Sequence, residues 1–251
     1  MMNTTLSRRM IDISLLGPFT GDFTKPYSFQ VGPHWKDFIG FRVVEGTDHS
    51  RHFFGGQTWE LPICPNCKES LHQIFTFDLS DPRLAIVRID NLKELPLISC
   101  LNCSYYWEPQ TFKLDPIKNQ ITILHQNNTQ NWEMDAEDKI PSPLPRMDMK
   151  LMNMFKGDIP VDDESYESAF ESFGDEYICR LLGAPLYASG PIDRECPCCS
   201  KEMIYVSTIT GETYGNERNA ISTVDFVIGE SLIYFLFCKD CLLLKTEVQS
   251  T

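Results

Sequence analysis

Hydrophobic and polar residues alternate along parts of the chain in the pattern typical of half-buried β-strands. Residues 72–79 (HQIFTFDL) show this alternation, and residues 204–210 (IYVSTIT) repeat it. Two short apolar stretches, 96–99 (PLIS) and 232–237 (LIYFLF), have the length and composition of buried strands. The pattern therefore predicts an α+β protein that is mostly β.

A helical period appears within residues 163–174 (DESYESAFESFG), where Asp163 is a suitable N-cap and Gly174 a suitable stop. The apolar residues of this stretch fall on one helical face: Tyr166, Ala169, Phe170 and Phe173. We expect one short helix that packs on a sheet through this face.

The expected helix lies within a strongly acidic segment. Residues 133–176 contain thirteen acidic and four basic residues, a net charge of -9 out of -13 for the whole chain, and they include the proline cluster PSPLP at 141–145. Because charge runs are usually solvated, we interpret the segment as a solvated connector with the helix docked on a sheet. The alternative is a docking surface for a basic protein partner.

Composition and charge limit the classes of function. The 251 residues are 42% hydrophobic, which is enough for a sizeable core. A net charge of -13 makes the average surface repel phosphate backbones and anionic lipid headgroups, so binding to nucleic acid or to a membrane surface is disfavoured. No apolar run has the length of a signal peptide core or of a membrane span, so we expect a cytoplasmic protein.

Eight of the ten cysteines form pairs with Cys-x-x-Cys spacing, where random placement would give fewer than one such pair. In a reducing compartment this spacing indicates metal ligation or redox chemistry rather than structural disulfides. The four pairs are Cys64/Cys67 (CPNC), Cys100/Cys103 (CLNC), Cys196/Cys199 (CPCC) and Cys238/Cys241 (CKDC).

Structural zinc explains these pairs better than redox chemistry does. Two thiolates three residues apart on a tight turn can face one ion, and two such turns close a tetrahedral cage with no open position. We expect sequential pairing and two structural zinc ions, with Cys198 left open as a replacement for Cys199. The alternative is a thiol redox protein that uses Cys64 and Cys67. The expected ligands are Cys64, Cys67, Cys100 and Cys103 for one ion, and Cys196, Cys199, Cys238 and Cys241 for the other.

Catalytic motifs give no support to an enzyme. The chain lacks a Gly-x-Ser-x-Gly elbow, a phosphate loop, Gly-x-Gly-x-x-Gly and His-Glu-x-x-His. His49 and His52 are expected on a surface loop, and His72 could substitute as a ligand beside the first pair. Cys179 is expected in the core. The remaining candidates are the acidic group Asp162, Asp163 and Glu164, the aromatic anchors Trp59, Trp107 and Tyr187, and a small basic face of Arg194, Lys201, Lys239 and Lys245.

The two sets of cysteine pairs belong to stretches that resemble each other. FGGQTW at 54–59 precedes the first pair and LGAPLY at 182–187 precedes the third, each with glycine in second place and an aromatic residue in sixth. We therefore expect two pseudo-repeated β-rich halves, each with a zinc-ribbon-like site, joined by the acidic connector. The expected boundaries are 1–130, 131–176 and 177–251.

These motifs resemble those of the bacterial YwqG-like proteins and of the related eukaryotic programmed-cell-death-protein-two family. The likeness rests on FFGGQTW and CPNC in the first half, and on LLGAPLY, CPCCSKEM and LIYFLFCKDC in the second. It covers about residues 40–110 and 175–251. Ala184, Tyr187 and Ser200 depart from the family signature, which has glycine, tryptophan and glycine at those places.

The resemblance implies protein binding and no reaction. The eukaryotic family is associated with protein binding in ribosome assembly, and some bacterial relatives sit near toxin genes, which would suit an acidic immunity-type protein. We therefore expect a zinc-stabilised protein-binding module and not an enzyme, with a basic protein as its partner.

Overall fold

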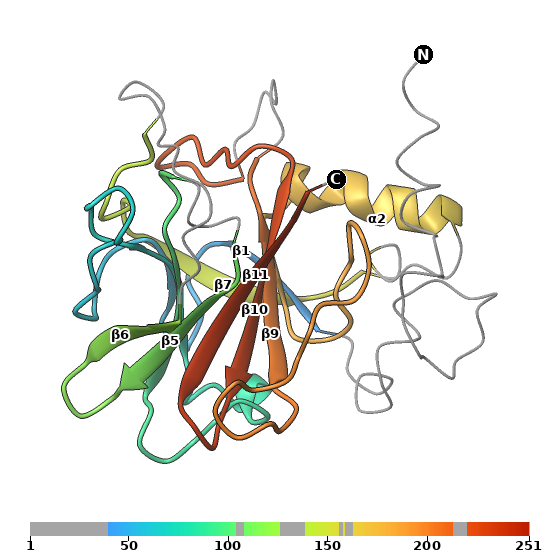
Figure 1. Cartoon of the computed structure of the whole chain (residues 1–251). Helices are drawn as coiled ribbons and strands as arrows, with labels where there is room; N and C mark the ends of the chain where they lie inside the picture. The colour runs from blue at the N-terminus through green and yellow to red at the C-terminus, as the bar shows by residue number, and fades with distance from the viewer. Residues whose placement is uncertain are drawn as a thin grey trace.

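Eleven strands of the described chain form one curled antiparallel sheet in the computed structural model (Figure 1). Across the sheet the strands follow the order β4-β3-β2-β7-β1-β8-β9-β10-β11-β5-β6. The structure describes residues 40–103, 108–125, 139–155, 158, 163–212 and 220–250. The strands are β1 (Phe41–Glu45), β2 (His52–Phe54), β3 (His72–Asp78), β4 (Glu94–Ser99), β5 (Gln110–Asp115), β6 (Gln120–His125), β7 (Met147–Asn153), β8 (Cys179–Leu181), β9 (Ile204–Thr210), β10 (Ser231–Cys238) and β11 (Leu243–Ser250).

The hydrophobic pattern located these strands correctly. The four predicted stretches form β3, β4, β9 and β10, and the prediction of a mostly β protein is confirmed. Strand β10 is buried at every position, because it lies inside the sheet with side chains covering both of its faces. A short 3-10 helix, η4 (Pro82–Leu84), follows β3.

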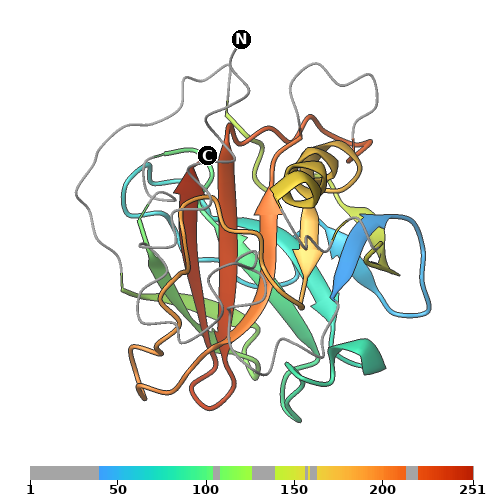
Figure 2. The same cartoon turned by 90° about the vertical axis from the view of Figure 1, so that its right-hand side faces the viewer.

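The predicted helix is α2 (Asp163–Asp175), which lies across one end of the sheet (Figure 2). The side chains of Tyr166, Ala169 and Phe173 are buried, and Phe170 packs partly buried against the same cluster. Gly174 has a φ of 114° and ends the regular helix, as the sequence predicted. No described helix is both long enough and apolar enough to span a bilayer.

Part of the acidic segment belongs to the sheet. Strand β7 pairs with β2 on one side and with β1 on the other, and it buries Met147, Met149 and Leu151. The interpretation of residues 133–176 as a solvated connector is therefore wrong for this stretch. Asp148 and Lys150 alternate with the buried residues in the ordinary period of a strand, which the sequence analysis missed because it interpreted the whole acidic segment from its charge.

The two halves repeat the same strand geometry. β3 pairs with β2 and β4, just as β9 pairs with β8 and β10. The pairing skips Ile74 in β3 and Val206 in β9, and each of these bulge residues follows the second cysteine of the preceding pair by seven positions. This agreement supports the internal repeat, whereas the exact boundaries of the halves stay a prediction.

The backbone corrects the alignment of the two halves by one residue. The amide of Gly55 donates to the carbonyl of Ile74, and the amide of Leu182 donates to the carbonyl of Val206. Leu182 is therefore the counterpart of Gly55, although the sequence motifs had matched Gly55 with Gly183. Leu182 keeps the left-handed backbone of a glycine turn, with a φ of 57°.

Strand β5 joins the first half to the second. It pairs with β11 and not with β4, and β6 follows it as the last strand of the sheet. The sheet curls back toward the first half at this edge, where the amide of Ile121 in β6 donates to the carbonyl of Glu60 in the loop after β2. One hydrophobic cluster therefore extends over both halves.

Candidate metal centres

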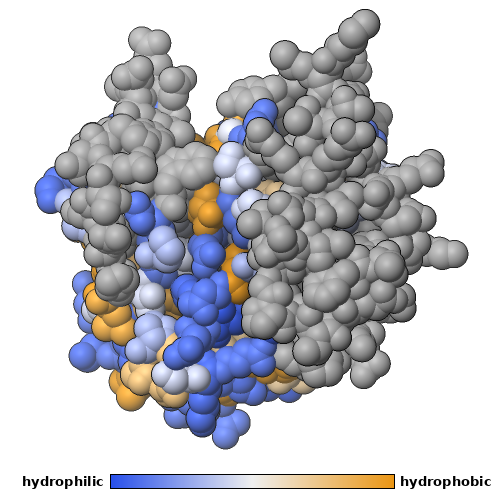
Figure 3. Space-filling view, turned by 45° about the vertical axis from the view of Figure 1, so that its right-hand side comes forward, coloured by the Kyte–Doolittle hydropathy of each residue, from blue (hydrophilic) through white to orange (hydrophobic). Residues whose placement is uncertain are grey.

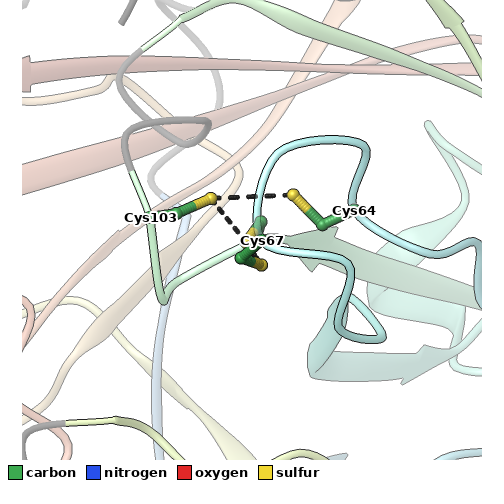
Figure 4. Close-up of side chains that lie close together, drawn as sticks. Cys64, Cys67 and Cys103 are labelled. Carbon is green, nitrogen blue, oxygen red and sulfur yellow. Dashed lines mark hydrogen bonds between the residues drawn. The ribbon is translucent and has the colours of Figure 1, made fainter. Parts of the chain in front are cut away.

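The first centre gathers Cys64, Cys67, Cys100 and Cys103 from the turn before β3 and the turn after β4. Their sulfurs all lie within 4.8 Å of one another, and three pairs lie 3.4 to 3.7 Å apart. Figure 4 shows the sulfurs of Cys64 and Cys103 facing each other, with Cys67 beside them. All four residues are at most 8% exposed, so this centre is closed to solvent.

These separations are those of a metal cage and not of disulfides. A disulfide bond is about 2.05 Å long. A tetrahedral zinc ion with Zn–S bonds of about 2.3 Å requires sulfurs about 3.8 Å apart. The donors present therefore fit a divalent d10 ion in both position and chemistry, and all ten cysteines are free.

The second centre gathers Cys196, Cys199, Cys238 and Cys241, from the turn before β9 and the turn between β10 and β11. The sulfurs of Cys199 and Cys238 lie 3.7 Å apart. Cys199 and not Cys198 belongs to this group of four, which is the choice that the spacing favoured. Cys199 and Cys241 are only partly buried, so the second centre is more open than the first.

The first turn of each centre has the same backbone. The amide of Cys64 donates to the carbonyl of the residue five positions later, and the carbonyl of Cys64 accepts from the amide of the residue four positions later. The backbone of Cys196 makes the same two hydrogen bonds. The residue after the second cysteine has a left-handed backbone in both turns, with φ of 64° at Lys68 and 56° at Ser200. This position favours glycine, which neither turn has.

Ser200→Gly is expected to raise the free energy of unfolding by about 0.5–1 kcal/mol, since a left-handed non-glycine residue costs about 1–2 kcal/mol and the greater freedom of glycine in the unfolded chain offsets part of the gain. Chemical denaturation of the zinc-loaded protein measures the change. Ser189→Gly is the matched control, because Ser189 is exposed and its φ is not positive, so it should be neutral or destabilising. A loss of stability in Ser200→Gly would contradict the expected strain.

The protein environment sets how easily the cysteines ionise. A hydrogen bond with Cys100 lowers the pKa of Cys64, but the hydrogen bond with Cys103 and burial raise that pKa to about 12. Burial acts to raise the pKa of Cys196, but the backbone amides of its own turn, together with the thiols of Cys238 and Cys199, bring that pKa below its ordinary value. Four buried thiols cannot all ionise without a cation, so ionisation of the first centre is coupled to metal binding.

The burial of the first pair weighs against a redox couple. A redox-active thiol needs a lowered pKa and partial exposure, usually at the N-terminus of a helix. Cys64 is 0% exposed, and strand β3 rather than a helix follows the pair. The first pair therefore has the surroundings of structural ligands.

His72 supports the first centre from outside its ligand set. Its Nδ1 accepts a hydrogen bond from the amide of Leu101 at 3.3 Å, and its Nε2 lies 3.2 Å from the carbonyl oxygen of Ile140. Both ring nitrogens are therefore engaged, and His72 is not placed to replace a cysteine. Such outer contacts orient the ligands of a metal site.

Asn102, which the sequence analysis did not single out, ties the acidic segment to the same turn. Its amide nitrogen donates to the carbonyl of Ile140 at 2.8 Å, and its side-chain oxygen accepts from the amide of Ile140 at 2.8 Å. Next to this contact, Lys139 pairs with Glu69 of the first turn at 2.5 Å. Residues 139–140 are thereby held over the first centre.

Asn102→Ala is expected to lower the free energy of unfolding by about 2 kcal/mol, because it leaves the amide of buried Ile140 without a partner and its carbonyl with His72 alone. We also expect about tenfold weaker zinc binding at the first centre, measured by competition with a chromogenic chelator. Asn91→Ala, at an exposed position, is the control and should change neither quantity. Equal behaviour of the two variants would show that the contact with Ile140 is dispensable.

The second centre also draws on the first half of the chain. The Nζ atom of Lys113 in β5 donates to the carbonyl of Cys241 at 2.5 Å. Lys201 lies beside the centre and pairs with Asp240 at 2.6 Å. A zinc ion with four thiolates carries a net charge of -2, so these cations reduce its electrostatic cost.

The candidate basic face near the second centre is largely neutralised. Arg194 pairs with Glu202, and Lys201 and Lys245 pair with Asp240 and Asp193. The fourth cation, Lys239, donates to the carbonyl of Ile86. Ion pairs of this kind leave little free positive charge for a phosphate backbone.

His52 is buried, and the expectation of a surface loop is wrong for it. It lies on β2, where the amide of Asp78 donates to its Nδ1 at 3.2 Å and its Nε2 lies 2.9 Å from Asp81. This arrangement places the ring hydrogen on Nε2, facing the carboxylate. The polar neighbours of His52 in the sequence concealed its inward position on a three-residue strand. His49 is exposed as expected.

The other candidates fall in the core or outside the described residues. Cys179 is fully buried beside Ser207, which confirms its predicted role in the core, and burial raises its pKa to about 12. Trp59 and Tyr187 are 2% and 1% exposed, so they pack in the interior. Outside the described part of the chain, or with undescribed side chains, are Trp107, Asp162, Asp163 and Glu164.

The structure thus brings the eight candidate ligands into two groups of four, paired in sequence order as expected. The identity of the metal and the family of the chain are predictions from the residues. No family model matches the chain, and no curated protein or solved structure shows significant similarity to it, so the resemblance to the YwqG-like proteins stays a prediction.

Proposed function

We propose that this protein is a zinc-stabilised module that binds another protein, with one structural zinc ion at each four-cysteine centre. The observation that carries the proposal is the match between the sulfur separations of 3.4 to 3.7 Å and the edge of a zinc–thiolate tetrahedron. Four protein ligands leave no position for water or substrate. The ions would therefore stabilise the fold and not carry out a reaction.

Each ion would close a long loop of the sheet. The first centre joins the turn before β3 to the end of β4 across the 32 residues between Cys67 and Cys100. The second joins the turn before β9 to the end of β10 across the 38 residues between Cys199 and Cys238. Fixing both ends of such loops offsets the entropy lost when distant strands pair.

A surface at the end of α2 supports binding to a basic protein. Phe155 is 54% exposed and stacks on the guanidinium of Arg42 at 3.8 Å, and Arg42 also pairs with Glu176 at 2.7 Å. Glu171, in the last turn of the helix, and Asp175, just after Gly174, are both exposed near Glu176. We call Phe155, Glu171, Asp175 and Glu176 the α2 acidic surface.

The rest of the described surface suggests polar contacts as well. In the view of Figure 3 most described residues are hydrophilic, and the apolar ones form small separate groups. Among the described residues the large apolar side chains that are exposed are Ile63, Ile117, Leu124, Met152 and Phe155. An exposed aromatic residue among carboxylates can anchor a partner whose approach is steered by charge.

Metal content tests the zinc part of the proposal. Elemental analysis of protein purified without added zinc or chelator should give two zinc ions per chain, and the eight thiols should resist alkylation until a chelator is added. One ion would restrict the proposal to one centre. A protein without metal whose thiols alkylate freely would overturn it and turn attention to Cys64 and Cys67 as a redox pair.

Charge neutralisation tests the binding part. Capture of a purified basic partner should weaken with rising salt, and the double variant Glu171→Gln/Asp175→Asn should weaken it several-fold. Asp90→Asn/Glu195→Gln removes the same charge from exposed residues elsewhere and should leave capture unchanged. Capture that is insensitive to salt and to both variants would exclude the α2 acidic surface.

A further inference from the structure

Two buried arginines lie side by side on neighbouring strands of the sheet. Arg42 in β1 is directly opposite Arg180 in β8, and residues opposite each other in an antiparallel pair have Cβ atoms about 4.5–5.5 Å apart on the same face. The two residues are only 5% and 3% exposed. Because like charges repel and buried charges need compensation, this pair of guanidinium groups requires negative charge nearby.

One buried carboxylate lies beside the pair, but its hydrogen bonds go elsewhere. The carboxylate of Asp158 accepts from the amide of Phe155 at 2.6 Å and from the hydroxyl of Tyr177 at 3.3 Å. The Nε atom of Arg42 lies 3.8 Å from this carboxylate, which is too far for a hydrogen bond. Arg180 donates to the hydroxyl of Tyr177 and to the backbone carbonyl of Asp158, both at 3.0 Å, so these partners are neutral groups.

Two hydrogen-bond donors of the arginine pair are unused. Among the described residues, the Nε atoms of Arg42 and Arg180 are buried and have no hydrogen-bond partner. Unsatisfied buried donors are rare in folded proteins, and an ion that the site binds is one explanation of them. Glu176 bonds Nη1 of Arg42 at 2.7 Å, but its side chain is 58% exposed, so water screens its charge. The buried groups alone, two guanidiniums and one carboxylate, have a net charge of +1.

We propose that Arg42 and Arg180 form a binding site for a carboxylate, which accepts a hydrogen bond from each of the two free Nε atoms. A single carboxylate neutralises the buried groups, whereas a phosphate dianion would leave them negative. A small organic acid and the C-terminus of a peptide both present this carboxylate. Neither arginine belongs to a metal centre, so the site does not depend on the proposed zinc ions.

Two exposed side chains cover the site. The ring of Phe155, which is 54% exposed, lies 3.8 Å from the guanidinium of Arg42, and the carboxylate of Glu176 bonds the same guanidinium. Both side chains are more than half exposed, so they can turn outward into solvent without disturbing the core. The ligand enters by this movement, and the charge of Glu176 competes with it for Arg42.

Titration with acetate tests the site. Thermal unfolding is followed in sodium acetate, with the ionic strength held constant by sodium chloride. We expect the melting temperature to rise by about 3–5 °C when acetate reaches about ten times its Kd, and inorganic phosphate to have a smaller effect. A tripeptide with a free C-terminus and its amidated form distinguish the two sources. A larger effect of the free tripeptide than of acetate would identify a chain terminus as the ligand, and the reverse a small acid.

Arg180→Met removes one of the two free donors. An apolar side chain of similar length in place of a buried charge is often neutral or stabilising, so the variant should melt no lower than the unmodified chain in chloride. It should lose the acetate effect. Arg146→Met is the matched control, because Arg146 lies 3.9 Å from the ring of Phe53 but is exposed, and it should keep the acetate effect.

Glu176→Gln keeps both arginines and removes the competing charge, so it should bind acetate several-fold more tightly. An acetate effect that is absent, that is equal in Arg180→Met and the unmodified chain, or that phosphate exceeds would overturn the inference. If Arg180→Met is strongly destabilised in chloride, Arg180 has a structural role and Glu176→Gln decides the question. Unchanged acetate affinity in Glu176→Gln would then overturn the site.

Discussion

Cys64→Ser is expected to lower the zinc content from two ions to one and to unfold much of the sheet. Structural zinc contributes apparent binding free energies of about 10–16 kcal/mol, which is comparable to the whole stability of a domain. Cys64 is fully buried among three other thiols, so a serine there leaves an incomplete cage that water cannot fill. Elemental analysis and thermal denaturation of the same sample measure both effects.

The control for Cys64→Ser is Cys198→Ser, which changes a cysteine next to the other centre that is not one of its four members. It should keep two zinc ions and the original melting temperature. A Cys64→Ser protein that also keeps two ions and melts normally would show that Cys64 is not a ligand. A chelator added to the unmodified protein should reproduce the unfolding, since removing the metal has the same consequence as removing a ligand.

Gly55→Ala is expected to lower the free energy of unfolding by about 3–5 kcal/mol, because the added Cβ atom would clash with backbone atoms. A Cβ at this position would lie 2.1 Å from the carbonyl oxygen of Pro145 and 2.9 Å from that of Leu144. Gly55 also has a φ of +63°, where an L-residue costs about 1–2 kcal/mol before any clash. Denaturant unfolding at saturating zinc measures the sum of the two effects.

Gly229→Ala separates strain from crowding. Gly229 has nearly the same backbone, with a φ of +68°, but a Cβ there would meet nothing within 4 Å. Gly229→Ala should therefore lower the free energy of unfolding by only about 1–2 kcal/mol, which is the effect of the left-handed backbone without a clash. Equal costs for the two variants would mean that residues 144–145 do not press on Gly55 in solution.

The sequence was most informative where one local pattern decides the outcome. Alternating residues identified β3 and β9, and the regular cysteine spacing identified both groups of four, because period and turn geometry are properties of neighbouring residues. The helix around Ala169 was predicted for the same reason. Its apolar face and its terminal Gly174 lie within thirteen residues of chain.

Features that depend on distant residues were not predicted. Strand β7 has the local alternation of a strand, but the acidic composition of the segment around it concealed this period, and only its pairing with β1 and β2 shows its place in the sheet. Asn102 could have been noticed within CLNC, but its partner Ile140 lies 38 residues away. The one-residue offset at Leu182 was missed because glycine was taken as the marker of the turn, and the leucine adopts the glycine-like backbone instead.

The pairing of β5 with β11 has a consequence for how the chain acquires its structure during synthesis. Translation produces β5 and β6 well before β11, so the β5–β6 hairpin emerges from the ribosome with an edge whose partner does not yet exist. An unpaired edge of this kind is open to other nascent chains, and sheets built from distant segments fold slowly. Slower translation between residues 125 and 243 would prolong the exposure of this edge and should therefore lower the soluble yield, and a holding chaperone should restore it.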